Sequence, residues 1–522
     1  FSPLFFNPPS LDGGCLVFRI KGVAMENDTL EQIKKLKQQG ARTPRVIIIG
    51  AGMSGICMGI RLLEAGIDDF VIYEKKEKIG GTWRENTYPG LACDIPSYFY
   101  SYSFEPNPNW SHRFPPGAEI QQYFESVFEK YKLAAYTQFN TEISDTRFED
   151  GKWKITLANG NTDSAEFLVA ATGILHQVKM PTIEGLDSFE GDQFHSAQWD
   201  HDVDLKDKRI GIVGTGSTAI QMFSPLSEVA KQLTLFQRTA QWVIAVPNKE
   251  YSPWWKKLVA NNTWLSNWVY RGYKFIIEQT VGKAVIQPGF QRNMLNKMCE
   301  NSLREVKDRK LRHRLTPDYD PGCKRLVMSS TFYPAIQKPN CALVTENIER
   351  IEPKGIRTKD GKLHELDVMV ICTGFDGHAF MRPMSMTGKN GLSLADAWEK
   401  GPKALRAMTM PGFPNFFMLI GPHSPIGNYS LIPLAEQQSL YTMQCIQMYM
   451  EEKFDQIEPK EQAMTDFYQK ITDALPNTVW TTGCQSWYQG ADGVPELWPW
   501  SPQRYMEEIA KPIMTEYELS KG

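Results

Sequence analysis

Residues 45–55, RVIIIGAGMSG, decide the fold of this chain. The run of β-branched residues predicts a buried strand, and the G-x-G-x-x-G pattern after it predicts a phosphate-binding turn that opens a helix. Gly50 permits the tight turn, and Gly52 lets backbone N–H groups approach a pyrophosphate together with the neighbouring Ser54. Gly55 lets the helix pack closely on the strand. The stretch therefore predicts a Rossmann-like dinucleotide site.

A second strand, in DFVIYEK, ends at Glu74, 24 residues after Gly50. A carboxylate at this place accepts hydrogen bonds from ribose hydroxyls and repels a 2′-phosphate. Strand, turn, helix, strand and terminal acid follow in order, which makes a purely structural turn the weaker interpretation. The first site is therefore expected to bind FAD.

A second glycine turn lies in residues 209–219, RIGIVGTGSTA, where Ala219 takes the third glycine's place. The strand after it, in QLTLFQRT, ends with Arg238 and Thr239 rather than with an acid. A cation there favours a 2′-phosphate and hence NADPH, although a surface arginine after a strand is the alternative. The residues expected to line this second turn are Gly214, Thr215, Gly216, Ser217 and Thr218.

Composition and charge narrow the classes of function. The 522 residues are 42% hydrophobic and 22% charged with a net charge of −3, which gives no indication of a nucleic-acid partner. No apolar run of about 18 residues predicts a membrane span.

Nine scattered cysteines without C-x-x-C spacing predict reduced thiols in a cytoplasmic protein, with no disulfide framework and no metal site. Residues 1–24 lack the pattern of a signal peptide and are interpreted as a leader or an extension before Met25.

Two loops carry charges that belong near a flavin. GGTWRENTYPGLACD (80–94) follows the first strand–helix–strand unit closely and ends at Asp94, which requires a cationic partner if it is buried. PGCKR (321–325) supplies Lys324 and Arg325 as candidates. Arg325 is always protonated and can hold an oxyanion, and Lys324 can reach the same 2′-phosphate as Arg238. Two solvated charges on a loop are the alternative.

These motifs carry a family resemblance. FEGDQFHSAQWD (189–200) matches the fingerprint F-x-G-x-x-x-H-x-x-x-W-[PD] of type I Baeyer–Villiger monooxygenases, and GGTWRENTYPGLACD matches their shorter signature. The resemblance covers about residues 43–510. DIPSYFYSYSFEPNPNW and CQSWYQGADGVPELWPW are similar to the 4-hydroxyacetophenone monooxygenase branch. Flavin monooxygenases that act on N and S atoms are also similar, but their fingerprint normally closes with a basic residue where this chain has Asp200.

The resemblance implies an NADPH- and O₂-dependent enzyme that inserts oxygen next to a ketone carbonyl, with a thioether as a possible substrate and no obligate protein partner. It implies that Arg325 stabilises a peroxide anion on flavin C4a and that Asp94 positions this arginine. It also implies that His195 couples domain motion to cofactor position, whereas a buried histidine without a special role is the alternative. The residues that the resemblance places at cofactors are Thr82, Trp83, Asp94, Tyr100 and Ile143 for FAD, and Arg238, Thr239, Lys324, Arg325 and Trp487 for NADP.

The expected fold class is α/β, with two Rossmann-like dinucleotide-binding domains. Residues 1–39 form an extension, 40–180 and 377–522 the FAD-binding domain, and 181–376 the NADP-binding domain with a helical insertion at about 250–315. Strands in FLVAATGIL (167–175) and DVMVICTGFD (367–376) are expected to close the two domains and lead into linkers. The insertion's Trp264, Trp268 and Phe275 are predicted to pack in a core rather than touch a membrane or substrate.

Three other functions compete with ester formation. An N- or S-oxygenating flavoprotein shares the fold and both cofactors. A disulfide reductase needs a close redox pair of cysteines, which the spacing does not provide. A flavin-binding regulator without enzymatic activity predicts no substrate-dependent consumption of NADPH.

Overall fold

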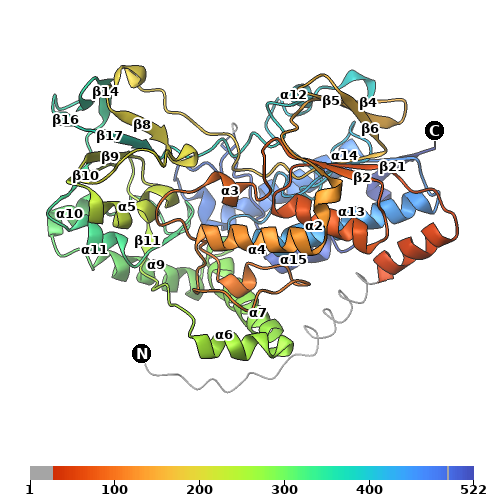
Figure 1. Cartoon of the computed structure of the whole chain (residues 1–522), viewed down its shortest axis with the longest axis horizontal. Coiled ribbons are helices and arrows are strands. Elements are labelled where there is room, and N and C mark those ends of the chain that lie inside the picture. Colours follow the sequence, from red (N-terminus) through yellow and green to blue (C-terminus); the bar gives the residue numbers. More distant parts are fainter. Residues whose placement is uncertain (1–27, 491–492, 522) are drawn as a thin grey trace.

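The computed structural model describes residues 28–490 and 493–521, so the interpretation of residues 1–24 lies outside the described part. Two lobes, each built on a parallel sheet, stand side by side, with α3 (Thr82–Glu85) and α4 (Gly117–Lys130) between them in the view of Figure 1. The expected fold class, two Rossmann-like units in one chain, is confirmed. Residues 28–38 form a helix whose Leu30 and Ile33 are buried in the largest core cluster.

The first sheet has the strand order β19–β7–β1–β2–β3, and all its pairs are parallel. Every residue of β1, β2, β7 and β19 is buried, as expected of a parallel sheet covered on both faces. Helix α2 (Met53–Glu64) packs between this sheet and α13 (Leu431–Met450), which explains why most of its residues are buried. The strands are β1 (Val46–Ile49), β2 (Phe70–Tyr73), β3 (Thr137–Gln138), β7 (Phe167–Ala170) and β19 (Phe416–Met418).

The second sheet repeats this plan in the other lobe, with the strand order β13–β10–β9–β17–β8 and parallel pairing throughout. Helix α5 (Ser217–Val229) follows its central strand as α2 follows β1. The strands are β8 (Asp192–His195), β9 (Arg209–Val213), β10 (Gln232–Phe236), β13 (Cys341–Val344) and β17 (Val368–Ile371).

Smaller sheets and helices complete each lobe. The order β18–β4–β5–β6 forms a sheet beside the first lobe, and β14, β15 and β16 form an antiparallel sheet beside the second. The remaining elements are β4 (Ile143–Glu149), β5 (Lys152–Leu157), β6 (Thr162–Ala165), β11 (Val243–Ile244), β12 (Val327–Met328), β14 (Ile348–Glu352), β15 (Gly355–Thr358), β16 (Leu363–Glu365), β18 (Ser385–Thr387), β20 (Gln456–Pro459), β21 (Tyr517–Ser520), α11 (Phe332–Ile336), α12 (Leu394–Ala397), α14 (Glu461–Ala474) and α15 (Pro502–Glu508).

The chain crosses between the lobes through two linkers that lie together. Strand β7 leads into residues 171–180, and β17 leads into residues 372–377. Val178 and Phe375 form an isolated antiparallel bridge, and the Thr373 hydroxyl donates to the Lys179 carbonyl at 2.5 Å. The two strand–Thr-Gly segments therefore do lead into linkers, and these linkers are hydrogen-bonded to each other.

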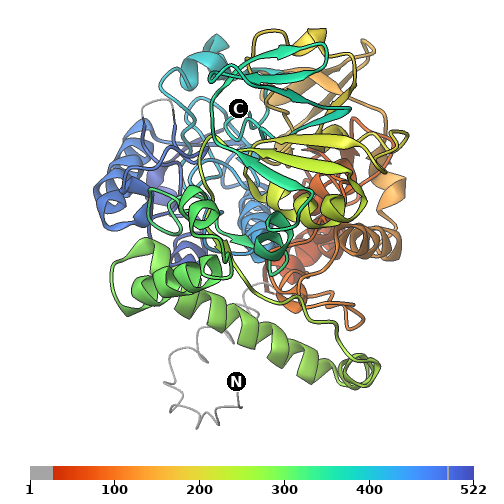
Figure 2. The ribbon, with the colours of Figure 1, turned by 90° about the vertical axis from the view of Figure 1, so that its left-hand side faces the viewer.

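A helical insertion follows β11, and its helices α6 and α7 lie along the lower edge of the molecule in Figure 1. Figure 2 shows the same region from the side. The prediction that its aromatic residues pack in a core is wrong for Trp264, Trp268 and Phe275, which are 67%, 67% and 59% exposed. The opposite face of the same helix is buried at Ser266 and Tyr270 instead. The insertion consists of α6 (Pro253–Ala260), α7 (Thr263–Ile277), the π-helical turn η5 (Glu278–Gly282), α8 (Lys283–Ile286), α9 (Phe290–Leu303) and α10 (Arg309–Arg314).

Among the described residues, no helix is both long enough and apolar enough to cross a bilayer.

Candidate active site

The first glycine turn has the geometry that its sequence predicts. Gly50 adopts a φ of +101°, and a Cβ on it would lie 2.8 Å from the Ala171 carbonyl oxygen. A Cβ on Gly55 would lie 1.9 Å from the Gly50 oxygen, so the helix approaches the strand in a way that only glycine permits. Gly52 is the N-cap of α2 and provides no side-chain cap, and its Cα faces Gly81. The first N–H groups of α2 therefore border a cradle suited to a phosphate.

Glu74 lies at the carboxyl end of β2 and is buried. Its carboxylate accepts hydrogen bonds from the Ala51 N–H at 2.9 Å and the Lys76 N–H at 3.0 Å, and forms an ion pair with Arg84 at 3.2 Å. The acid thus fixes the shape of the glycine turn itself. Its contact with a ribose stays a prediction.

The loop at residues 80–94 joins the two lobes. At its start, the Trp83 indole N–H donates to the Tyr100 hydroxyl at 3.0 Å, and Thr82 opens the short helix α3. At its other end, a Cβ on Gly90 would lie 2.5 Å from the Gln221 carbonyl oxygen in α5. That carbonyl has lost its helical partner, because residue 225 is a proline without an N–H. The Tyr-Pro-Gly sequence therefore lets the loop at residues 80–94 pack against α5 of the second lobe.

Asp94 and Arg325 meet in a two-pronged ion pair. The Nε and Nη2 atoms of Arg325 each donate to a different Asp94 oxygen at 2.9 Å. The Gln241 amide donates to the Arg325 backbone carbonyl, which fixes the loop as well as the side chain. Asp94 raises the pKa of Arg325 further above its ordinary value. With 40% of its side chain accessible, Arg325 is a permanent cation that still presents a face to a ligand.

Tyr488, which the sequence analysis missed, borders the other side of Arg325. Burial raises the pKa of the Tyr488 phenol, and the nearby Arg325 charge opposes that rise. The adjacent Trp487 is 37% exposed and packs against Gly377 in the second linker, where a Cβ would lie 2.7 Å from the indole. A small hollow opens beside these two rings and is also lined by Ile174, His378, His423, Ile426 and Glu496.

His378 ties this segment to the linker and was also missed. Its Nδ1 lies 2.7 Å from a carboxylate oxygen of Glu496, 118 residues away in sequence. The bond to Glu496 raises the pKa of His378 above its ordinary 6.5, and the Trp487 backbone adds to the effect. No sequence signal relates these residues, since each lies in an irregular segment.

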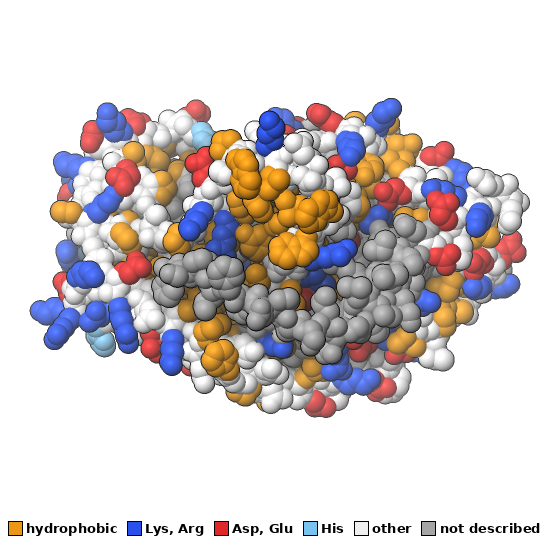
Figure 3. All heavy atoms as spheres, turned by 90° about the horizontal axis from the view of Figure 1, so that it is seen from below, with side chains coloured by type: hydrophobic (Ala, Val, Ile, Leu, Met, Phe, Trp, Pro, Cys, Tyr) orange, Lys and Arg blue, Asp and Glu red, His pale blue; other side chains and the backbone are white. Residues whose placement is uncertain are grey.

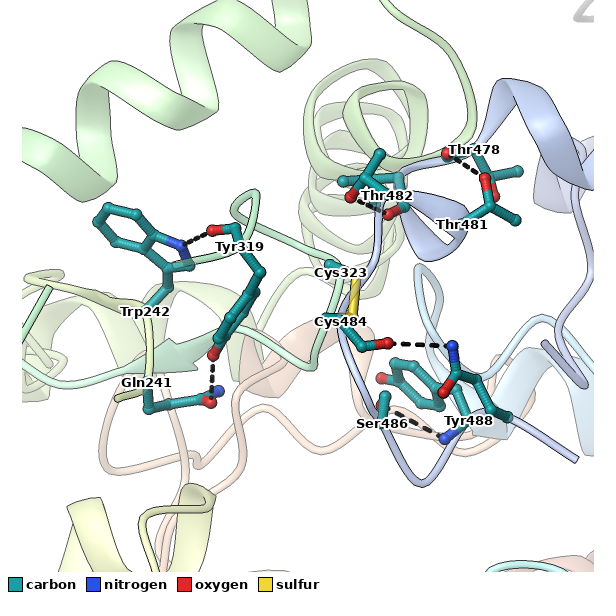
Figure 4. Close-up of a disulfide and its surroundings, with 12 residues drawn as sticks. Gln241, Trp242, Tyr319, Cys323, Thr478, Thr481, Thr482, Cys484, Ser486 and Tyr488 are labelled. Carbon is teal, nitrogen blue, oxygen red and sulfur yellow. Dashed lines mark hydrogen bonds between the residues drawn. A yellow bond between two sulfur atoms is a disulfide. The ribbon is translucent and has the colours of Figure 1, made fainter. Parts of the chain in front are cut away.

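A disulfide joins Cys323 to Cys484, with the Cα atoms 6.1 Å apart (Figure 4). The expectation of reduced thiols without a disulfide is wrong for this pair. The two residues are 161 positions apart, and only the folded loops bring them into disulfide range. Cys323 stands two residues before Arg325 and Cys484 three before Trp487, so the bond connects the loops that carry these residues.

The second glycine turn mirrors the first. Gly214 has a φ of +118°, and a Cβ on it would lie 2.4 Å from the Cys372 oxygen. Gly216 is the N-cap of α5, which starts at Ser217 and Thr218. The Thr215 hydroxyl donates to the Thr239 carbonyl at 2.7 Å, joining the turn to the end of β10.

Lys324 and Arg238 lie close enough for their charges to repel. Burial lowers the pKa of Lys324, and the Arg238 charge lowers it further. The Lys324 ammonium also lies 4.8 Å from the centre of the Tyr319 ring. The charge of Asp318 acts on Lys324 in the opposite direction. Two neighbouring cations suit a dianionic phosphate.

Two further residues named in the sequence analysis, His195 and Ile143, are both buried. His195 is buried against the second linker: its Nδ1 accepts from the Ala197 N–H at 3.1 Å, and its ring meets Phe375 edge-on. Burial lowers the pKa of His195, which favours the neutral ring. Ile143 is the first residue of β4 and is buried in a core cluster, and its contact with FAD stays a prediction.

Comparisons with known proteins agree with this geometry. The family model described as flavin-binding monooxygenase-like matches residues 43–382. An uncharacterized monooxygenase of Mycobacterium tuberculosis is 47% identical over 92% of this chain and 97% of its own. A Baeyer–Villiger monooxygenase of Pseudomonas aeruginosa is 36% identical over 86% of each chain. The crystal structure of OTEMO in complex with FAD and NADP is 25% identical, with a TM-score of 0.81 over 92% of this chain and 100% of that one.

Proposed function

This chain belongs to the flavin-binding monooxygenase-like family, and from that premise we propose that it is an FAD- and NADPH-dependent Baeyer–Villiger monooxygenase. The reaction takes a ketone, O₂, NADPH and a proton, and yields an ester or lactone, NADP⁺ and water. The N- or S-oxygenating alternative is not favoured, because relatives from Pseudomonas aeruginosa and Streptomyces coelicolor that match most of the chain are named Baeyer–Villiger monooxygenases.

The observation that carries the proposal is the Asp94–Arg325 pair between the two lobes. Oxygen insertion into a ketone requires stabilised negative charge on the attacking oxygen and exclusion of water. A guanidinium that two bonds from Asp94 hold in place supplies that charge without reorganising during the reaction. Tyr488 lies close to Arg325, and the adjacent Trp487 packs against Gly377 in the second linker. We expect these two rings to limit the access of water when the cofactors are bound.

The cradles fit two dinucleotides. We assign FAD to the turn of Gly50, Gly52 and Gly55, and NADPH to the turn of Gly214 and Gly216, with Arg238 and Lys324 on its 2′-phosphate. The flavin, when bound, supplies the oxygen activation that no side chain can provide. Residues about 40–180 and 377–522 are proposed as the FAD-binding domain and 181–376 as the NADP-binding domain, in a cytoplasmic enzyme that needs no protein partner.

Purification of the yellow protein, followed by product analysis over a ketone panel with NADPH, tests the function. We expect esters or lactones that carry one atom of ¹⁸O from ¹⁸O₂. A matched thioether panel serves as the comparison. Sulfoxides in the absence of any ester would overturn the proposal in favour of the N- or S-oxygenating class.

A further inference from the structure

The outward face of the helical insertion exposes large aromatic side chains. We define the aromatic face as Trp254 of α6 together with Trp264, Trp268, Phe275 and Ile276 of α7, which are between 52% and 69% exposed. The spacing of Trp264, Trp268 and Phe275, four and then seven residues, puts them on one side of the helix. Figure 3 shows hydrophobic side chains gathered on the face of the molecule that α6 and α7 form at the bottom of Figure 1.

Folding of the insertion does not use this face. The opposite side of α7 anchors the helix: Tyr270 packs edge-on against Phe99, with ring centres 5.2 Å apart. The Tyr273 and Tyr251 hydroxyls are hydrogen-bonded at 3.2 Å. Exposed tryptophans gathered on one surface mark an interaction site more often than isolated ones do.

The charge around the face is positive. Residues 250–278 contain four basic residues against Glu250 and Glu278, a net charge of +2, although the whole chain carries −3. Glu278 pairs with Lys274 at 3.4 Å, which leaves Lys256, Lys257 and Arg271 as the other cations of this segment. Lys257 and Arg271 are exposed beside the aromatic residues. Tryptophan combined with lysine and arginine is the composition of helices that lie in the interface of a bilayer with anionic lipids.

We propose that the aromatic face docks on the surface of an anionic lipid bilayer, with α7 lying in the plane of the interface. Helix α7 has 15 residues, about 22 Å at 1.5 Å per residue, and is too short to span about 30 Å of hydrocarbon. A second copy of the chain is a poorer occupant, because a twofold contact would set this basic surface against itself. The cytoplasmic leaflet, in contrast, attracts such charge. The inference does not rest on the proposed function.

Vesicle co-sedimentation of the FAD-loaded enzyme tests the proposal. We expect the enzyme to pellet with vesicles of phosphatidylcholine and phosphatidylglycerol, more weakly with phosphatidylcholine alone, and less at high salt. The triple variant W264S/W268S/F275S should keep its flavin absorbance and bind at least about tenfold more weakly. The control variant I513S/L519S, which removes exposed apolar side chains elsewhere, should bind as the wild type does.

Charge and depth are tested separately. K257E/R271E should lose binding to the anionic vesicles, whereas K359E, which changes an exposed lysine of the β15–β16 turn, should not.

Brominated phosphatidylcholine should quench the wild-type tryptophan fluorescence. W264F/W268F should still bind but show less quenching, since it keeps the apolar face and removes two of its three tryptophans.

Three results would overturn the proposal. The first is no sedimentation with either vesicle type. The second is normal binding by the triple variant together with a loss of binding by F5S/F6S, a variant of the N-terminal extension tested in the full chain. The third is a concentration-dependent dimer, seen by light scattering, that the triple variant abolishes, because this result assigns the face to a second copy.

Discussion

Arg325 owes its suitability for oxyanion chemistry to the groups around it. The two hydrogen bonds that it donates to Asp94 fix its orientation, Gln241 fixes its backbone, and the buried Tyr488 lies close to it. Lysine at this position would keep a positive charge but could not reproduce the planar fork. The site therefore depends on a guanidinium rather than on charge alone.

Replacing Arg325 with alanine should retain FAD binding and reduce ester formation at least about 100-fold, the range seen when one oxyanion donor is removed. Visible absorbance of the flavin and product yield under NADPH measure the two effects. R304A, which removes an exposed arginine from the insertion, is the control and should leave both unchanged. Ester formation at the wild-type rate by R325A would exclude Arg325 from the mechanism.

Arg238 and Lys324 are proposed to bind the 2′-phosphate because their positive charges lie close enough to repel each other. R238A should raise the KM for NADPH by about 10- to 100-fold, since a hydrogen bond to a charged group contributes about 1.5–3 kcal/mol. The KM for NADH should change little, because NADH lacks the phosphate. Steady-state kinetics with both coenzymes give the answer, and R309A, an exposed arginine of α10, is the control. Equal changes for the two coenzymes would contradict the assignment.

At the scale of elements, the sequence predicts the strands and turns that consecutive residues form. The strands β1 and β9, their glycine turns and the resemblance to type I Baeyer–Villiger monooxygenases are all confirmed, because strand propensity and turn geometry reside in consecutive residues. The orientation of α7 was not predictable, because it carries aromatic residues on both sides. Large tryptophans were assigned to the core, while Tyr270 and Tyr273 are the residues that pack inward.

Contacts between irregular segments left no sequence signal. His378 and Glu496, and likewise Cys323 and Cys484, are brought together only when the lobes assemble. Neither pair has the close sequence spacing by which a motif is recognised. The parts of the site that hold Trp487 and Tyr488 in place were therefore the parts that sequence reasoning missed.

The His378–Glu496 contact should make the anchoring of the Trp487 segment depend on pH. The folded state raises the pKa of His378, so the stabilisation is complete below pH 6.5 and is lost as the pH rises through the raised value. The Tm difference between the wild type and H378Q should thus be largest in acid and shrink toward alkaline pH. H364Q is the control with the opposite sign, because burial lowers the pKa of His364. A difference for H378Q that grows with pH would contradict the role of this pair.

For the whole molecule, the disulfide is a covalent connection between the two halves of the site. Cys323 belongs to the segment that carries Lys324 and Arg325, and Cys484 to the segment that carries Trp487. Closing a loop of this length restricts the unfolded chain, which contributes about 2–5 kcal/mol to stability. It also links the segment that carries Trp487 and Tyr488 to the loop that carries Arg325 in the folded state.

C484S should therefore lower the Tm by several degrees and, with saturating ketone, raise the fraction of consumed NADPH that yields hydrogen peroxide instead of ester. The physical reason is that a loosened Trp487 segment admits water to the region around Arg325, and the reaction requires that water be excluded from this region. Differential scanning fluorimetry and peroxide detection measure the two effects, and a dithiol reductant should reproduce both in the wild type. C341S, which changes a partly buried thiol of the second sheet, is the control. If C484S loses stability yet keeps wild-type coupling of NADPH to ester, the bond stabilises the fold without positioning the site.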